Sequence, residues 1–193
     1  MTTQPPSILT LDPRALKVLA HPLRSRLLTA LRTHGAATAT ELARDLVANT
    51  GATSYHLRKL ASVGLVEETE DGRGRERPWR AATDMHGWTE RDVAADPDAR
   101  TATDWLRRYY LHTFVERYEA WLDTQAGWPL DWQDAAGASD FALRLTPAGL
   151  AAFNADIRAL HERYLAMPPT GDPTDVQTVE VHVHAFPLEA TAR

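Results

Sequence analysis

The 193-residue sequence predicts a mainly α fold with a small β component, of the α+β class. Three observations support this prediction. Apolar residues recur at three- and four-residue intervals through much of the chain, as they do on one face of a helix. Strand-like runs occur at 65–70, 77–82, 141–145 and 176–186, with clear alternation at 65–70 and in the second half of 176–186. Proline and glycine separate these segments at the positions where helices begin and end.

The composition argues against a disulfide-bonded, secreted or membrane-spanning protein. The chain has no cysteine, which excludes disulfides and thiolate metal sites. Its first residues lack the basic start and apolar run of a signal peptide, and no segment approaches the roughly 18 apolar residues of a membrane span. We therefore expect a cytoplasmic protein with no membrane segment and no cofactor.

The first elements have clear start signals. Residues 1–10 are expected to be a disordered lead. Asp12 followed by Pro13 is a helix cap and first-turn proline, and Pro22 starts a second helix that ends near Gly35. We expect both helices to face a common core.

Two short helices are then predicted around a tight break at Asn49–Gly51. The first, 40–47, places Leu42, Ala43 and Leu46 on one face, and the second, 50–62, does the same with Thr53, Leu57 and Leu60. The outer face of the second helix carries Ser54, Tyr55, Arg58 and Lys59. This arrangement is typical of a helix-turn-helix, which reads DNA with its second helix in the major groove.

A hairpin is predicted directly after these helices. Residues 65–70 alternate like a strand, 71–74 are rich in turn residues, and 77–82 form the returning strand. In this position the hairpin is a wing, whose Arg73, Arg75 and Arg77 would reach phosphates or a narrow minor groove. The alternative is an ordinary solvated hairpin.

Charge is divided unevenly along the chain. Residues 14–80 hold 12 Lys and Arg against 7 Asp and Glu, whereas the rest holds 9 against 19. A basic segment in a chain of net charge −5 suits a DNA-binding domain joined to a region that avoids DNA. We expect Thr50 and Gly51 to offer backbone N–H groups to a phosphate at the start of the second helix.

The second half is expected to be a separate region. A polar connector, 83–97, precedes a long helix at about 98–124 and another helix that starts at Thr146-Pro147. The alternating runs 141–145 and 176–186 are expected to form a short β-sheet. The domains predicted are therefore the lead, a winged helix-turn-helix at 11–82, the connector, and a dimerisation and effector region at 98–193.

Several motifs match a known family in order and spacing: residues 19–28, the helix at Glu41–Leu46, Ser54–Leu60 and Gly64–Val66. Over residues 13–82 the chain resembles the ArsR-type winged-helix transcriptional regulators. The resemblance implies a homodimer built from the first and last helices of the winged-helix core, which an inducer bound away from the DNA loosens. The cysteines of the metal-sensing members fall here at Thr38 and Thr40, which are not soft-metal ligands.

Other residue clusters leave alternatives open. His112 and Glu116 share a helix face, and His161, Glu162, His182 and His184 add further zinc ligands, but exposed polar pairs explain them better. We expect no metal. Trp105, Tyr109, Trp121, Trp128 and Phe153 either line a pocket for a small organic ligand or fill a core.

The sequence contains no arrangement of catalytic residues that matches a known motif, so we expect no enzyme. It predicts a bacterial, homodimeric regulator that binds double-stranded DNA in a sequence-specific way. A repressor is favoured, with activation as the alternative, and the second half either binds a small-molecule effector or sets the dimer geometry. The alternative is a winged helix that contacts another protein and binds no DNA.

Overall fold

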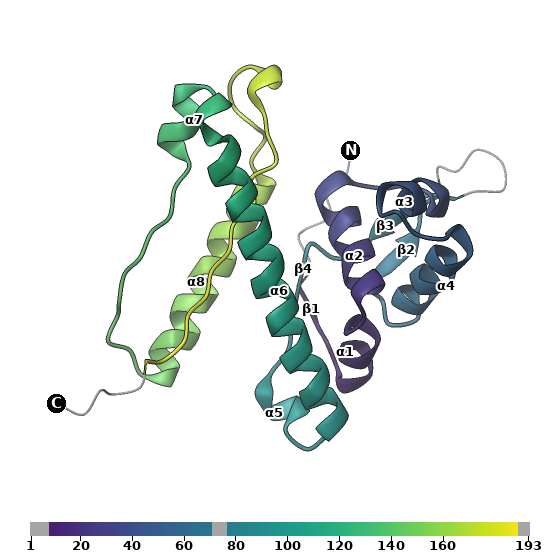
Figure 1. Cartoon of the computed structure of the whole chain (residues 1–193). Helices are drawn as coiled ribbons and strands as arrows, with labels where there is room; N and C mark the ends of the chain where they lie inside the picture. The colour runs from purple at the N-terminus through teal and green to yellow at the C-terminus, as the bar shows by residue number, and fades with distance from the viewer. Residues whose placement is uncertain (1–7, 71–76, 189–193) are drawn as a thin grey trace. The chain divides into compact units, whose positions relative to one another are not determined.

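The computed structural model describes residues 8–70 and 77–188, which fall into two compact units, 8–111 and 112–188 (Figure 1). The boundary between the units lies inside one long helix, α6 (Pro97–Thr124). The fold is mainly helical with small strands, as the sequence predicts. Within the described residues, no helix is both long and apolar enough to cross a membrane.

Local capping sets the first two helices, α1 (Pro13–Leu19) and α2 (Pro22–His34). The Asp12 carboxylate accepts a hydrogen bond from the Ala15 N–H at 2.7 Å, and the His21 Nδ1 accepts one from the Leu23 N–H at 3.2 Å. Both helices have proline in their first turn, where no backbone N–H is needed. The predicted start signals are confirmed.

The next pair is α3 (Ala39–Asp45) and α4 (Thr50–Ala61). Thr38 and Glu41 form a capping box at the start of α3, in which each side chain accepts from the backbone N–H of the other. The predicted break at Asn49–Gly51 is wrong by a few residues, because Gly51 already lies in α4. The chain reverses at Val47, which has a positive φ of 51°.

The wing consists of β2 (Val66–Glu68) and β3 (Trp79–Ala81), paired antiparallel with Val66 opposite Ala81. Gly64, between α4 and β2, has a φ of +73°, which only glycine adopts at low cost. The predicted hairpin is confirmed up to its tip, and Arg73 and Arg75 lie outside the described residues.

The structure corrects two predictions near the ends of this unit. Part of the expected disordered lead forms β1 (Ile8–Thr10), which pairs parallel with β4 (Met85–Gly87). The expected connector holds β4 and the short helix α5 (Glu90–Val93). Sequence periodicity missed this sheet because its strands are three residues long and 77 residues apart at their paired positions.

The core of the first unit is built mainly from leucine side chains on α1, α2, α3, α4 and α6. Leu16, Leu27, Leu57 and Leu65 are fully buried. The first half of α6 belongs to the same core through Ala99, Ala102 and Leu106. The compact unit therefore continues to residue 111, beyond the predicted end of the winged helix at 82.

The second unit contains the rest of α6, α7 (Leu130–Ala135), α8 (Pro147–Ala166) and two short 3₁₀ turns, η1 (Gln125–Gly127) and η2 (Pro173–Asp175). The Thr146 hydroxyl caps α8 as predicted. The short β-sheet predicted here is wrong: 141–145 and 176–186 are extended but form no ladder with described residues. A strand needs a paired edge, which neither segment has.

Candidate nucleic-acid interface

The helix α4 has a buried face and an exposed face, as its periodicity predicts. Thr53, Leu57 and Leu60 are completely buried and fix the helix on the core. On the other side Arg58 and Lys59 are exposed, Tyr55 is half exposed and Ser54 is partly exposed. The exposed face is therefore polar and basic, with an aromatic ring at its centre.

The N-terminal end of α4 is open to solvent. Asn49 caps it, since its Oδ1 accepts a hydrogen bond from the Ala52 N–H at 3.1 Å. The Asn49 carbonyl accepts from the Thr53 N–H. The N–H groups of Thr50 and Gly51 stand at the positive end of the helix dipole, where a phosphate is stabilised. A Cβ on Gly51 would lie 3.1 Å from the capping oxygen, so a side chain here would crowd the cap.

The exposed side chains of α4 support one another. The Lys59 ammonium lies 5.6 Å from the centre of the Tyr55 ring, within cation–π range. The Tyr55 ring meets the His56 ring edge-on at 5.2 Å. These contacts hold Tyr55 and Lys59 in a defined geometry on the helix surface.

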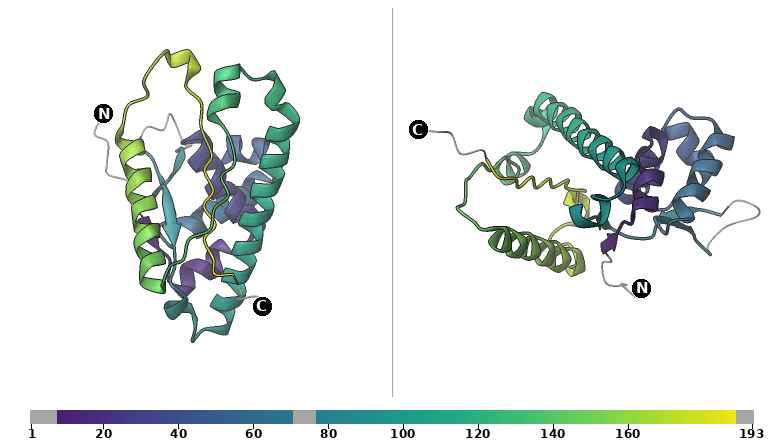
Figure 2. Two further views of the ribbon diagram at one scale, coloured as in Figure 1. Left: turned by 90° about the vertical axis from the view of Figure 1, so that its left-hand side faces the viewer. Right: turned by 90° about the horizontal axis from the view of Figure 1, so that it is seen from below.

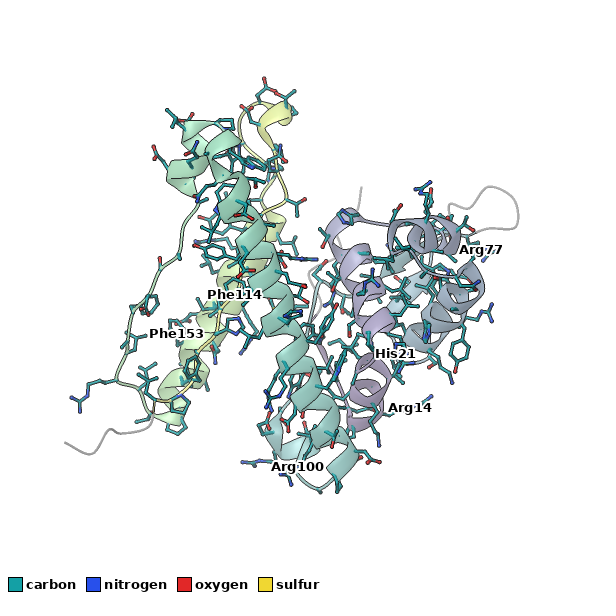
Figure 3. All side chains as sticks on the ribbon, in the orientation of Figure 1. Arg14, His21, Arg77, Arg100, Phe114 and Phe153 are labelled. Carbon is teal, nitrogen blue, oxygen red and sulfur yellow. The ribbon has the colours of Figure 1, made fainter. Side chains whose placement is uncertain are left out.

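A histidine pair connects α4 to the start of α2. The rings of His21 and His56 lie 4.5 Å apart, and Figure 3 labels His21 at this junction. Burial lowers the pKa of both imidazoles; for His56 the neighbouring His21 lowers it further, and the charge of Arg24 lowers the pKa of both rings. These shifts favour the neutral form of each ring. This contact could not be predicted from the sequence, since nothing in the local pattern relates residues 35 positions apart.

A second contact that could not be predicted from the sequence holds the turn between α3 and α4. The Arg26 guanidinium on α2 donates a hydrogen bond to the Leu46 carbonyl at the end of α3, at 3.0 Å. That carbonyl is one of the groups that a helix end leaves without a partner. Arg26 therefore positions the turn that carries α4.

At the base of the wing, the two strands are joined by an ion pair between Arg80 and Glu67, at 2.8 Å. Arg77, labelled in Figure 3, is exposed and pairs with no other described residue. Of the predicted wing arginines, only Arg77 is described. It lies just before β3, at the end of the hairpin away from the core.

The predicted aromatic pocket residues divide between the two units. In the first, Trp105 and Tyr109 stack at 5.1 Å. In the second, Trp121 and Trp128 lie 5.6 Å apart, and Phe153 is a partly buried residue of α8, labelled in Figure 3. The pocket stays a prediction.

Of the candidate metal ligands, His112 pairs with Glu116 and His182 pairs with Glu180. His112 Nε2 and Glu116 Oε1 are 3.2 Å apart on an exposed face of α6. In the described part of the chain, no three histidine or carboxylate side chains converge on one point.

The arrangement of α2 to α4 followed by a two-stranded hairpin defines a winged helix-turn-helix, a class of DNA-binding domain. Residues 19–69 match a family model described as a helix-turn-helix domain. This chain therefore carries a helix-turn-helix domain in its N-terminal half.

A comparison with curated protein sequences gives no significant match. Among solved structures, the chain is similar to a winged helix-turn-helix DNA-binding domain from Mycobacterium bovis, described as homodimeric and as a possible ArsR-family transcriptional regulator. The identity is 24%, the match covers 54% of this chain and 81% of that one, and the TM-score is 0.35.

Proposed function

We propose that this protein is an ArsR-type transcriptional regulator that binds specific sites in double-stranded DNA. The observation that carries the proposal is the exposed face of α4, which is polar and basic while its opposite face is locked into the core. Ser54 and Tyr55 are the candidates for base contacts, because they lie in the first half of the helix.

Phosphate contacts would surround this centre. Thr50 and Gly51 offer backbone N–H groups at the helix start, and Arg58 and Lys59 supply positive charge along the helix. Arg77 extends the basic surface to the wing, together with Arg73 and Arg75 at its predicted tip. Contacts of this kind fix the register of a protein on DNA without reading sequence.

The regulator is proposed to act as a cytoplasmic homodimer and to repress transcription. Two copies of α4 would then enter major grooves about one helical turn apart. Domain 11–82 would bind DNA, and the region after it would set the dimer geometry. No metal, cofactor or catalytic activity is part of this proposal.

The test is a titration of the full chain with labelled DNA. Fluorescence anisotropy at about 150 mM salt would compare the region upstream of its own gene with random duplex, where a specific site is favoured about a thousandfold or more. An Arg58→Ala/Lys59→Ala double variant should lose affinity for both. Equal affinity of the wild type for both DNAs would contradict specific recognition, and no binding to either would favour the protein-interaction alternative.

A small organic effector is the second part of the proposal. It is supported by the aromatic contacts around Trp105 and Trp121, which offer flat apolar surface for a planar ligand. To switch DNA occupancy strongly, such a ligand must favour one dimer geometry by a few kcal/mol. Native mass spectrometry of the purified protein tests this directly. A bound organic molecule whose removal changes operator affinity supports it, and unchanged affinity contradicts it.

A further inference from the structure

The second unit lacks a core of its own. None of its described residues, 112–188, is buried. Sixteen of its large apolar side chains are between 40% and 77% exposed, and they come from α6, α7, α8 and both extended segments. The first unit, by contrast, buries a continuous cluster of leucines.

The exposed apolar surface is large. Complete burial of a Val, Leu or Phe side chain removes about 60–120 Å² from water, so sixteen half-exposed side chains leave on the order of 1,000 Å². The total is spread over α6, α7, α8 and the two extended segments. It is comparable to the roughly 800 Å² that each partner contributes to a stable interface.

In a half-buried strand the apolar side chains usually pack against the rest of the protein. In the segment 176–186 the polar side chains do so instead. Its polar side faces its own chain: Glu180 pairs with Arg117 of α6, and the His182 ring packs against Phe114 at 4.7 Å. Figure 2 shows this segment running between α6 and α8, and Figure 3 labels Phe114 on α6. The alternate residues Val179, Val181 and Val183 are 63%, 77% and 48% exposed.

The backbone of this segment is also open. Residues 177–188 make no backbone-to-backbone hydrogen bond with other described residues. An extended segment with alternating valines and unpaired N–H and C=O groups is an edge that accepts another strand. The charge of Glu180 is already paired within the chain, so the open side presents apolar groups without a charge to be matched.

We infer that a second copy of this chain covers the valine side of segment 176–186 in the second unit, with the two 176–186 segments adjoining across a two-fold axis. A self-complementary contact suits this surface, because the same open edge and the same uncharged valine row are present on each copy. The area matches what a stable dimer needs, and a unit without a core requires a partner that is always present. The inference locates the dimer contact of the proposed function and rests on that dimer.

The first experiment measures molar mass by light scattering across micromolar concentrations. Wild type should be a dimer, and Val181→Glu should dissociate at least tenfold more readily. Thr178→Glu is the matched control: it adds a charge at an exposed residue of the same segment, on the side opposite the valines, and should leave the dimer intact. A Val181→Glu variant that dimerises like wild type would overturn the inference.

A second experiment keeps the inference testable if Val181→Glu unfolds. The chain has no cysteine, so Val181→Cys and Thr178→Cys each introduce one thiol. In the dimer the thiol at 181 should react with a soluble disulfide reagent at least tenfold more slowly than the thiol at 178, and dilution should remove the difference. Equal rates at high concentration would overturn the inference.

Failure of this inference is distinguishable from failure of the proposed function. A monomeric wild type that still prefers its own upstream region would exclude the shared surface and leave specific DNA binding intact. A dimer that depends on Val181 but shows no preference among DNA sequences would support the shared surface and contradict specific DNA binding.

Discussion

The Arg32 guanidinium and the His86 imidazole are joined by a hydrogen bond of 2.7 Å between Arg32 Nη1 and His86 Nδ1. Because arginine only donates, Nδ1 is the acceptor, and the proton of the neutral ring is on Nε2. Nε2 therefore donates to the Tyr110 hydroxyl at 2.8 Å. Arg32 also donates to the Thr83 carbonyl, so one buried network connects α2, β4 and α6.

This network predicts a loss of stability in mild acid. Burial, and secondly the charge of Arg32, lower the pKa of His86 from 6.5 to about 3. The unfolded chain therefore takes up a proton first as the pH falls, and the free energy of unfolding decreases from about pH 6.5 down to about pH 3. At pH 5 this histidine should cost about 2 kcal/mol relative to pH 8, measured by urea unfolding.

The variant His86→Gln tests whether His86 causes this loss of stability in acid. A glutamine can accept from Arg32 and donate to Tyr110 without titrating, so the variant should lose about 2 kcal/mol of the difference in stability between pH 8 and pH 5. His112→Gln, on an exposed side chain, is the control and should keep the pH dependence. A wild-type pH profile in His86→Gln would show that the network does not hold the ring neutral.

The turn before α4 contains a residue whose substitution should stabilise the protein. Val47 has a φ of 51° and is 93% exposed, so its β-branched side chain is strained and buries almost nothing. Val47→Asn should raise the free energy of unfolding by about 1 kcal/mol, because asparagine tolerates this conformation. Val47→Ala removes the β-branch but has no side-chain amide to hydrogen-bond the local backbone, so it should gain less. Equal stability of all three proteins in thermal unfolding would contradict strain at this residue.

Much of the first unit could be predicted because its signals are local. Pro13, Pro22, the Thr38–Glu41 pair and Gly64 mark element ends within a few residues of themselves. The face of α4 follows from its period alone, so its exposed residues were identified correctly. The contacts that orient this face were not, because His21, His56 and Arg26 meet their partners only after the chain folds.

In the second unit, sequence patterns predict the local conformation but not the pairing of its extended segments. Alternation at 176–186 correctly predicts an extended chain, but a sheet also needs a neighbouring edge, which residue order does not specify. The same alternation predicts two faces without saying which one meets the rest of the chain. Here Glu180 and His182 face α6, opposite to the usual arrangement.

The capping box of α3 should make a measurable contribution to stability. In Thr38→Ala the Glu41 N–H loses its acceptor, and the free energy of unfolding should fall by about 1 kcal/mol. Glu41→Gln keeps the reciprocal hydrogen bond to the Thr38 N–H and should have a smaller effect. Chemical denaturation at pH 7 measures both. A larger loss in Glu41→Gln than in Thr38→Ala would indicate that charge at the helix start matters more than the cap.

Substitutions in α4 and in the wing should affect DNA binding differently: one should change the preference for the specific site, and the other the affinity for any duplex. Tyr55→Ala removes a half-exposed ring from the centre of the helix face, so it should lower the preference for the specific site by about tenfold or more while changing affinity for random duplex little. Arg77→Ala should weaken both DNAs alike and reduce the slope of log affinity against log salt by about one. Tyr55→Phe keeps the ring beneath Lys59 and isolates the hydroxyl. Titrations at several salt concentrations distinguish the variants, and the opposite pattern, with Arg77 setting preference and Tyr55 setting the salt slope, would refute the assignment of α4 as the reading helix.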